Sequence, residues 1–365
     1  MAADGTRAIA DKHPSKIEWS ADPAVLRMQT FVNGFKPGEN PSAIDRMFIQ
    51  LPWFRETKAS VDRSLRMAKE ARKENCVRGQ GPSRAGKTCA GRALIREHMP
   101  WRDKDGLHMP RGYLRVPSVP SVSVVGQEVL RALGDSSWDQ RRNPVERLAR
   151  IGEVAEMVGL QALIVDDLHH IVDARGSRVQ HTVADLFIDI GNETAVPLVF
   201  LGLNRMGTIF EVNEQLRGRT GAPIQYLRLD WRNKKNRELF TDALNSVTAV
   251  LRESIPFDKS MDDGTLMFRM YCSTGGLLGY LVLILRVAED MCRGKKIPLG
   301  FEALRRAVGV VVGKESSWPG KRDPFHPEFV IEATKESLDA AQAVGKESGP
   351  AARKSGAPGS IGTRK

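Results

Sequence analysis

The stretch GPSRAGKT, residues 81–88, constrains this chain more than any other part of its sequence. It fits the pattern G-x-x-x-x-G-K-[ST], in which the glycines let successive backbone N–H groups turn inward around an anion. A helix that starts near Thr88 would direct the positive end of its dipole at the same anion. The side chain of Lys87 can reach the terminal phosphates, and the Thr88 hydroxyl can bind Mg²⁺. The pattern predicts a loop that binds a nucleotide's phosphates, and an ordinary lysine-capped turn is the alternative.

The predicted phosphate-binding residues are those of the loop and the residue that follows it. They are Gly81, Pro82, Ser83, Arg84, Ala85, Gly86, Lys87, Thr88 and Cys89.

A second pattern, ALIVDD at residues 162–167, supplies the partner that such a loop needs. Four apolar residues predict a buried parallel strand, and Asp166 follows at its carboxyl end, where ligands bind in open α/β sheets. Asp166 would hold Mg²⁺ directly or through water, so the predicted metal ligands are Thr88 and Asp166. Asp167 would orient and deprotonate the attacking water, which makes it the candidate catalytic base.

Strand and helix patterns alternate around these two motifs, so we predict a doubly wound α/β core with a parallel sheet. From Asn233 onward the pattern becomes helical, and four candidate helices suit a small domain after the sheet domain. The expected organisation is therefore a docking arm, a nucleotide-binding α/β domain, a helical lid and a mostly disordered basic tail. The boundaries are 1–50, 51–232, 233–315 and 316–365.

Composition narrows the choice of partners. The formal net charge of +11 favours a polyanion such as nucleic acid, with a surplus for solubility as the alternative. No apolar run reaches the roughly 18 residues that a membrane helix needs, so no membrane partner is expected. The four cysteines lack metal-ligand spacing, which favours reduced thiols. The N-terminus lacks the apolar core of a signal peptide, so both features favour a cytoplasmic protein.

The blocks DDLHH, VPLVFLG, EQLRGR and LDW, at residues 166–170, 196–202, 214–219 and 229–231, lie in the order found in one family. With the Pro/Ser loop VPSVPSVSVVGQEVLRALG and the segment TGGLLGYLVLILRVAE, they resemble the TniB/TnsC-type AAA+ ATPases of bacterial transposons. The resemblance covers roughly residues 45–310. It implies a P-loop AAA+ core that binds ATP and Mg²⁺ and forms homo-oligomers around its nucleotide.

The resemblance also implies roles for further residues. Asn204 would be the polar sensor beside the γ-phosphate, although the family often has a small hydroxyl residue one place earlier, where this chain has Leu203. Arg219 would reach the nucleotide of a neighbouring subunit, with Arg217 as the substitute. Many relatives carry Glu at the position of Asp167, and the shorter side chain favours slow, regulatory hydrolysis.

The family lines its central channel with the loop that follows RGYLRV. The resemblance therefore implies that Arg111, Arg115 and Ser121 contact DNA, following phosphates without reading bases. An exposed linker is the alternative.

Together these features predict an ATP-dependent regulator of transposition that forms a ring or filament on double-stranded DNA. It would recruit a transposase, work with a target-selector protein, and be nucleoid-associated in a bacterial cytoplasm. The alternatives are a helicase loader of the IstB/DnaC type and, as a weaker candidate, a STAND-type signalling ATPase.

Overall fold

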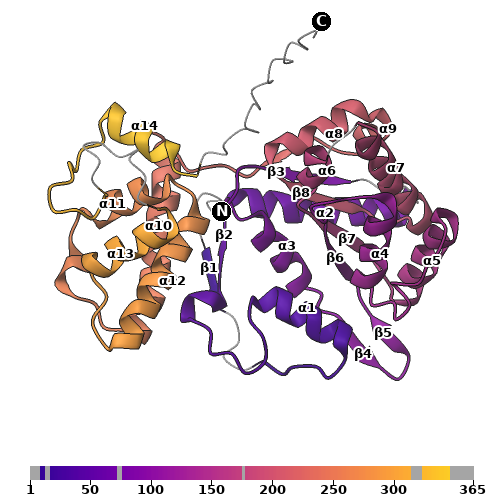
Figure 1. The fold of residues 1–365 in the computed structure, drawn as a ribbon, viewed down its shortest axis with the longest axis horizontal. Helices are drawn as coiled ribbons and strands as arrows, with labels where there is room; N and C mark the ends of the chain where they lie inside the picture. The colour runs from indigo at the N-terminus through magenta and orange to yellow at the C-terminus, as the bar shows by residue number, and fades with distance from the viewer. Residues whose placement is uncertain (1–8, 13–16, 72–75, 175–176, 314–322, 346–365) are drawn as a thin grey trace, which may run out of the picture.

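The computed structural model describes residues 9–12, 17–71, 76–174, 177–313 and 323–345. An α/β unit and a group of helices lie side by side, and an N-terminal segment runs along both of them (Figure 1).

Five strands form a parallel sheet in the order β6-β7-β8-β3-β9. They are β3 (Val77–Gln80), β6 (Arg111–Arg115), β7 (Ala162–Asp166), β8 (Leu198–Gly202) and β9 (Ile224–Gln225). All residues of β7 and β8 are buried, as expected for strands whose two faces are both covered by helices. Because β3 lies next to β8 and near β7, the glycine loop and the acidic strand end meet at one edge of the sheet. The predicted parallel α/β core is confirmed.

Helices cover both faces of this sheet (Figure 1). On one face lie α2 (Pro52–Ala71) and α3 (Lys87–Arg96), and on the other lie α4 (Val122–Ala132), α5 (Pro144–Met157) and α7 (Ser177–Thr194). The start of α5 illustrates how the sequence sets these bounds. Asn143 and Glu146 form a capping box around Pro144, a pattern that satisfies the first backbone donors of a helix.

Short elements connect the larger strands and helices of the α/β unit, with α8 and α9 at one end and the β4–β5 hairpin at the other (Figure 1). They are α6 (His169–Asp173), η2 (Asn204–Met206), α8 (Gly207–Val212), α9 (Glu214–Gly218) and the hairpin of β4 (Trp101–Asp103) and β5 (Gly106–His108).

The four predicted helices of the C-terminal domain are confirmed. They are α10 (Lys234–Ser254), α11 (Leu266–Thr274), α12 (Leu278–Lys295) and α13 (Phe301–Val311), with the short η3 (Lys259–Asp262) between the first two. An aromatic cluster joins this domain to the end of the α/β unit, because Trp231 packs against Phe240, Phe268 and Tyr271. Such aromatic pairs contribute about 0.5–1.5 kcal/mol each beyond the area they bury.

Over the described residues, no single helix combines the length and hydropathy needed to cross a membrane. One pair bent by 112°, Leu266–Thr274 with Leu278–Lys295, passes that test on length and composition alone.

The region after residue 316, expected to be mostly disordered, contains a further helix in its described part, α14 (Lys335–Ala343). Contacts from distant parts of the chain hold it: Arg228 donates to the Val344 carbonyl oxygen at 2.7 Å, and Arg232 pairs with Asp339 at 2.5 Å. Local sequence did not indicate this helix, because it is held by α11 and by arginines more than 100 residues away. Residues 314–322 and the predicted basic tail at 346–365 lie outside the described residues.

The N-terminal segment, expected to be a flexible arm, packs against both domains where it is described. Its elements are β1 (Ile9–Lys12), α1 (Pro23–Asn33), η1 (Ala43–Arg46) and β2 (Met47–Gln50). Helix α1 is capped by the Asp22 carboxylate and ends at Gly34, which has a φ of 79°, so its bounds follow from ordinary cap residues. Strand β1 pairs antiparallel with β2.

Candidate nucleotide-binding site

The glycine loop runs tightly between the ends of β3 and β9. A Cβ atom at Gly81 would lie 2.1 Å from the Tyr226 carbonyl oxygen, so only glycine fits there. Gly86, with a φ of 94°, occupies the N-cap position of α3, a left-handed conformation that glycine adopts without steric cost. The loop therefore wraps around the N-terminus of α3, where backbone N–H groups attract anions.

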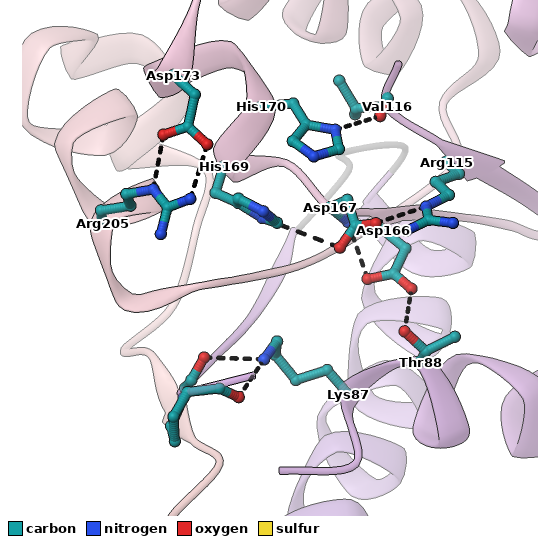
Figure 2. Close-up of polar contacts among 12 residues, drawn as sticks. Lys87, Thr88, Arg115, Val116, Asp166, Asp167, His169, His170, Asp173 and Arg205 are labelled. Carbon is teal, nitrogen blue, oxygen red and sulfur yellow. Dashed lines mark hydrogen bonds and ion pairs between the residues drawn. The ribbon is translucent and has the colours of Figure 1, made fainter. Parts of the chain in front are cut away.

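Lys87 is the first residue of α3, and its side chain points back into this loop (Figure 2). Its side chain is buried, and its ammonium nitrogen Nζ donates to the carbonyl oxygens of Gly81 at 2.8 Å and Pro82 at 2.6 Å. These contacts hold one positive charge within the loop itself. An incoming phosphate would meet that charge already desolvated, and an ionic contact is stronger in such a site than in water.

Thr88 and Asp166 come together across 78 positions of sequence, as Figure 2 shows. The Thr88 hydroxyl donates to Asp166 Oδ2 at 2.7 Å, and Asp166 is 1% exposed. Burial raises the pKa of Asp166, and its hydrogen bonds with Thr88, the Asp167 backbone and Tyr113 oppose that rise. A hydroxyl and a carboxylate at this distance are hard oxygen donors of the kind Mg²⁺ prefers, so the residues present fit that ion.

Asp167 follows directly and adopts a φ of 55°, which is uncommon for a residue other than glycine. Its backbone N–H donates to Asp166 Oδ1 at 2.8 Å, and its own Oδ2 accepts from Arg115 Nε at 2.5 Å. Arg115, whose side chain is 71% exposed, has its pKa raised by this hydrogen bond. The candidate base is thus paired with an arginine that reaches in from the surface.

His169 and His170 lie on the same side of the site (Figure 2). His169 Nδ1 is 3.9 Å from Asp167 Oδ1, and burial lowers the pKa of His169 to about 4, so this ring is neutral near pH 7. His170 Nδ1 lies 2.7 Å from the Val116 carbonyl oxygen. Both rings therefore lie near the acidic strand end without a hydrogen bond to either aspartate.

A cavity of about 650 Å³ opens beside the loop. Its polar end contains residues 83–89, Arg115 and Asp167, and its apolar end combines the N-terminal segment with the lid. The apolar lining includes Ile44, Met47, Phe48, Ile49, Leu51, Trp53, Phe54, Leu278, Val282 and Leu283. Such a division into charged and apolar ends suits a molecule with phosphates and an aromatic base.

The contribution of the N-terminal segment to this cavity was missed from the sequence. Its signal was the run MFIQLPWF at residues 47–54, the first strongly apolar stretch of the chain. Arg286 of α12 pairs with Asp45 of η1 at the cavity's edge, which ties this segment to the lid.

Asn204 and Leu203, the two candidates for the sensor position, face different hollows. Leu203 lines the cavity with the glycine loop. Asn204 is exposed and lines a separate hollow of about 390 Å³ with Gln80 and Arg217. The two candidate trans arginines lie at the end of α9, Arg217 in its last turn and Arg219 at its C-cap. Arg217 is largely exposed, and Arg219 is half-buried, its carbonyl oxygen accepting from the Cys76 N–H at 2.7 Å.

The three predicted DNA contacts have different environments. Arg115 is exposed, and Ser121 caps α4 by accepting from the Val124 N–H at 3.2 Å. Arg111 is only 3% exposed, so its side chain cannot reach a DNA phosphate in this conformation, and that prediction is corrected. Its guanidinium lies within the electrostatic influence of Asp62 and Glu97 instead.

Comparison with solved structures places this architecture among known folds. The chain is similar to an Aeropyrum pernix ORC2 protein in ADPNP–ADP complexes, with a TM-score of 0.51 and 10% identity over 82% of this chain and 74% of the other. It is also similar to Cdc6p from Pyrobaculum aerophilum, with a TM-score of 0.53 and 15% identity over 79% and 72% of the two chains. At these identities the likeness establishes the fold alone, and that fold is the AAA+ core with a helical lid.

No curated protein matches the sequence. The model of the bacterial TniB protein matches residues 44–223, the segment that carries the glycine loop, both aspartates and the Gln-Leu block. Over this segment the chain belongs to the bacterial TniB family.

Proposed function

We propose that this protein is an ATP-dependent regulator of DNA transposition that assembles on double-stranded DNA. The observation that carries the proposal is the contact between Thr88 and Asp166 beside the buried Lys87, at the mouth of a cavity large enough for a nucleotide. Membership of the TniB family over residues 44–223 directs the choice of process to transposition.

ATP would lie with its phosphates in the glycine loop and its base against the apolar wall. Backbone N–H groups of the loop would bind the phosphate oxygens together with the Lys87 ammonium, which the Gly81 and Pro82 carbonyl oxygens already hold inside the loop. Thr88 and Asp166 would hold Mg²⁺, which when bound neutralises charge on the phosphates. The wall formed by Met47, Phe48 and neighbouring residues would exclude water from the base.

Hydrolysis would depend on Asp167 and on a second copy of the chain. Asp167 would accept a proton from the attacking water once Arg115 leaves it. Arg219, with Arg217 as the substitute, would approach the γ-phosphate of a neighbouring protomer and stabilise the transferring charge. Asn204 would belong to the same interprotomer contact, since it lines the hollow that contains Arg217.

DNA binding would be electrostatic and largely independent of sequence. The chain carries a net charge of +11, and each phosphate that it neutralises would release condensed counterions, so affinity should fall steeply with salt. The exposed segment at residues 118–119, together with Arg115 and Ser121, is the surface we assign to phosphate contact. ATP would stabilise the assembled state by mass action, because it binds between protomers.

The assembly would mark a target site and recruit the transposase, and slow hydrolysis would then dismantle it. Asp167 supports a slow reaction, since its carboxylate is one methylene shorter than glutamate and is paired with Arg115. We also propose that the protein works with a target-selector protein. Its domain boundaries are proposed to lie near residues 50, 232 and 315.

The substitution Lys87→Ala tests the nucleotide site. Loss of a desolvated charge contact should weaken ATP binding by about 100-fold and abolish ATP-dependent assembly on DNA, while the melting temperature without nucleotide stays close to that of the wild type. Calorimetry measures the affinity, and electron microscopy with a non-hydrolysable ATP analogue measures assembly. Lys234→Ala on α10, where the lysine side chain is 81% exposed, is the control. Equal ATP affinity in Lys87→Ala and the wild type contradicts the proposed site.

A second experiment separates the proposed regulator from a helicase loader. Purified protein, ATP analogue and duplex DNA should suffice for rings or filaments. Assembly that appears only after a hexameric helicase is added would favour the loader instead.

A further inference from the structure

The carboxylate of Asp166 receives a hydrogen bond from outside the two motifs. The hydroxyl of Tyr113, on the neighbouring strand β6, donates to Asp166 Oδ2 at 2.9 Å. This is the same oxygen that accepts from Thr88 at 2.7 Å, while Oδ1 accepts from the Asp167 backbone at 2.8 Å. Three donors thus fix the orientation of a carboxylate that is 1% exposed.

The ring of Tyr113 is held in turn by the N-terminal segment. Phe31 of α1 stacks on it, with ring centroids 3.8 Å apart and an interplanar angle of 28°. Two arginines of α3 fix α1 at this point: the Arg92 guanidinium lies 5.2 Å from the Phe31 ring centroid, and Arg96 donates to the Val32 carbonyl oxygen at 3.0 Å. A continuous path of contacts therefore runs from α1 through Phe31 and Tyr113 to Asp166.

We propose that Tyr113 is a positioning residue for the Asp166 carboxylate and that Phe31 holds Tyr113 in place, which makes helix α1 a control element for metal-dependent nucleotide binding. This inference rests on the proposed function, because it assigns Thr88 and Asp166 to Mg²⁺. Partners of a metal ligand orient it, and losing one commonly weakens metal affinity by about 10- to 100-fold. A partner that displaced α1 would act on the nucleotide without touching the cavity.

Tyr113→Phe removes the hydroxyl and keeps the ring on which Phe31 stacks. The measurement is the affinity of the full-length protein for a fluorescent ATP analogue, with Mg²⁺ and with a chelator. The ratio of the affinity with Mg²⁺ to the affinity in chelator is the gain from Mg²⁺. We expect the gain from Mg²⁺ to fall about 10-fold, while the affinity in chelator stays within about 2-fold because the glycine loop and Lys87 are unchanged. A gain equal to that of the wild type in a folded variant would overturn the role of Tyr113.

Phe31→Leu keeps an apolar side chain on α1 and removes the stacked ring. The gain from Mg²⁺ should fall in the same direction but less, about 3-fold, since Phe31 acts on Asp166 only through its stack on Tyr113. An unchanged gain would overturn the link to α1. Tyr271→Phe is the matched control, because it also removes a buried hydroxyl, one that accepts from the Trp231 N–H at 3.2 Å in the lid. Failure of the wild type to bind the analogue at all would instead overturn the proposed function.

Discussion

Two hollows beside the α/β unit contain most of the residues expected to act on a nucleotide, and they differ in how complete they are. In the larger one, of about 650 Å³, the glycine loop lies with Asp167, and the Thr88–Asp166 contact is already made within one chain. In the smaller one, of about 390 Å³, Asn204 and Arg217 lie beside Gln80. Among the described residues, none lines both hollows.

The difference teaches that the proposed binding half of the site, the glycine loop with Thr88 and Asp166, forms within a single chain. The proposed arginine half is presented outward. Lys87 is buried and its ammonium bonded to the loop, so the binding half needs no partner to form. Arg217 is not fixed in this way, because its side chain is 60% exposed and makes only a weak contact with Glu214 at 3.8 Å. An arginine presented in this way can act on a second copy's nucleotide, and the predictions below test that division.

The largest expected effect comes from Arg219→Ala. If Arg219 acts in trans, ATP hydrolysis by the assembled protein should fall by about 10³-fold, because the transferring charge loses its stabilising partner. ATP affinity of the unassembled chain should remain near that of the wild type. Phosphate release in the presence of DNA measures the rate, and Arg217→Ala is the matched variant that decides which arginine acts.

Mixing two inactive variants sharpens this test. The Lys87→Ala protomer retains Arg219, and the Arg219→Ala protomer retains Lys87. In a mixed assembly, an interface between the two kinds of protomer can therefore combine an intact Lys87 from one with an intact Arg219 from the other. Partial recovery of hydrolysis on mixing supports action in trans. No recovery, together with weakened ATP binding by Arg219→Ala alone, would place the arginine in the binding half and break the comparison.

Asp167→Asn should have the next largest effect. Removing a general base typically costs about 10²-fold or more in rate, whereas the phosphate contacts remain, so ATP-bound assemblies on DNA should persist. Their lifetime after dilution into ATP is the measurement. Asp173→Asn, at the surface pair with Arg205, is the control. Hydrolysis at the wild-type rate in Asp167→Asn would show that another group takes the proton.

The binding half could be predicted from sequence because its geometry is largely local. Eight consecutive residues form the loop, and Asp166 reaches Thr88 because parallel strands end at one edge of a sheet. The four lid helices could also be predicted, since their apolar residues recur with helical spacing.

Other features depend on contacts that no local pattern encodes. Strand β1 pairs with β2 across more than 30 residues, and Asp45 meets Arg286 from the far end of the chain. Tyr113 was part of a strand pattern with nothing to indicate its bond to Asp166. Arg111 was expected to contact DNA because it lies near the loop with which the resembling family lines its channel. The fold instead places it in the interior, with Asp62 and Glu97 close enough to affect it.

Arg115→Ala has the smallest expected effect and examines the boundary between the binding half and the DNA surface. Arg115 pairs with Asp167 at 2.5 Å, yet its side chain is 71% exposed, and an ion pair this exposed contributes at most about 1 kcal/mol. Removing it should free Asp167 and raise hydrolysis without DNA by about 3-fold. The stimulation by DNA should decline, because the DNA phosphates no longer have an arginine to draw away from Asp167. Phosphate release with and without duplex DNA measures both effects, and Arg205→Ala, which breaks the surface pair with Asp173, is the control. A fall as deep as that of Asp167→Asn would mean instead that Arg115 holds the base in its working position, so that the binding half extends to the surface.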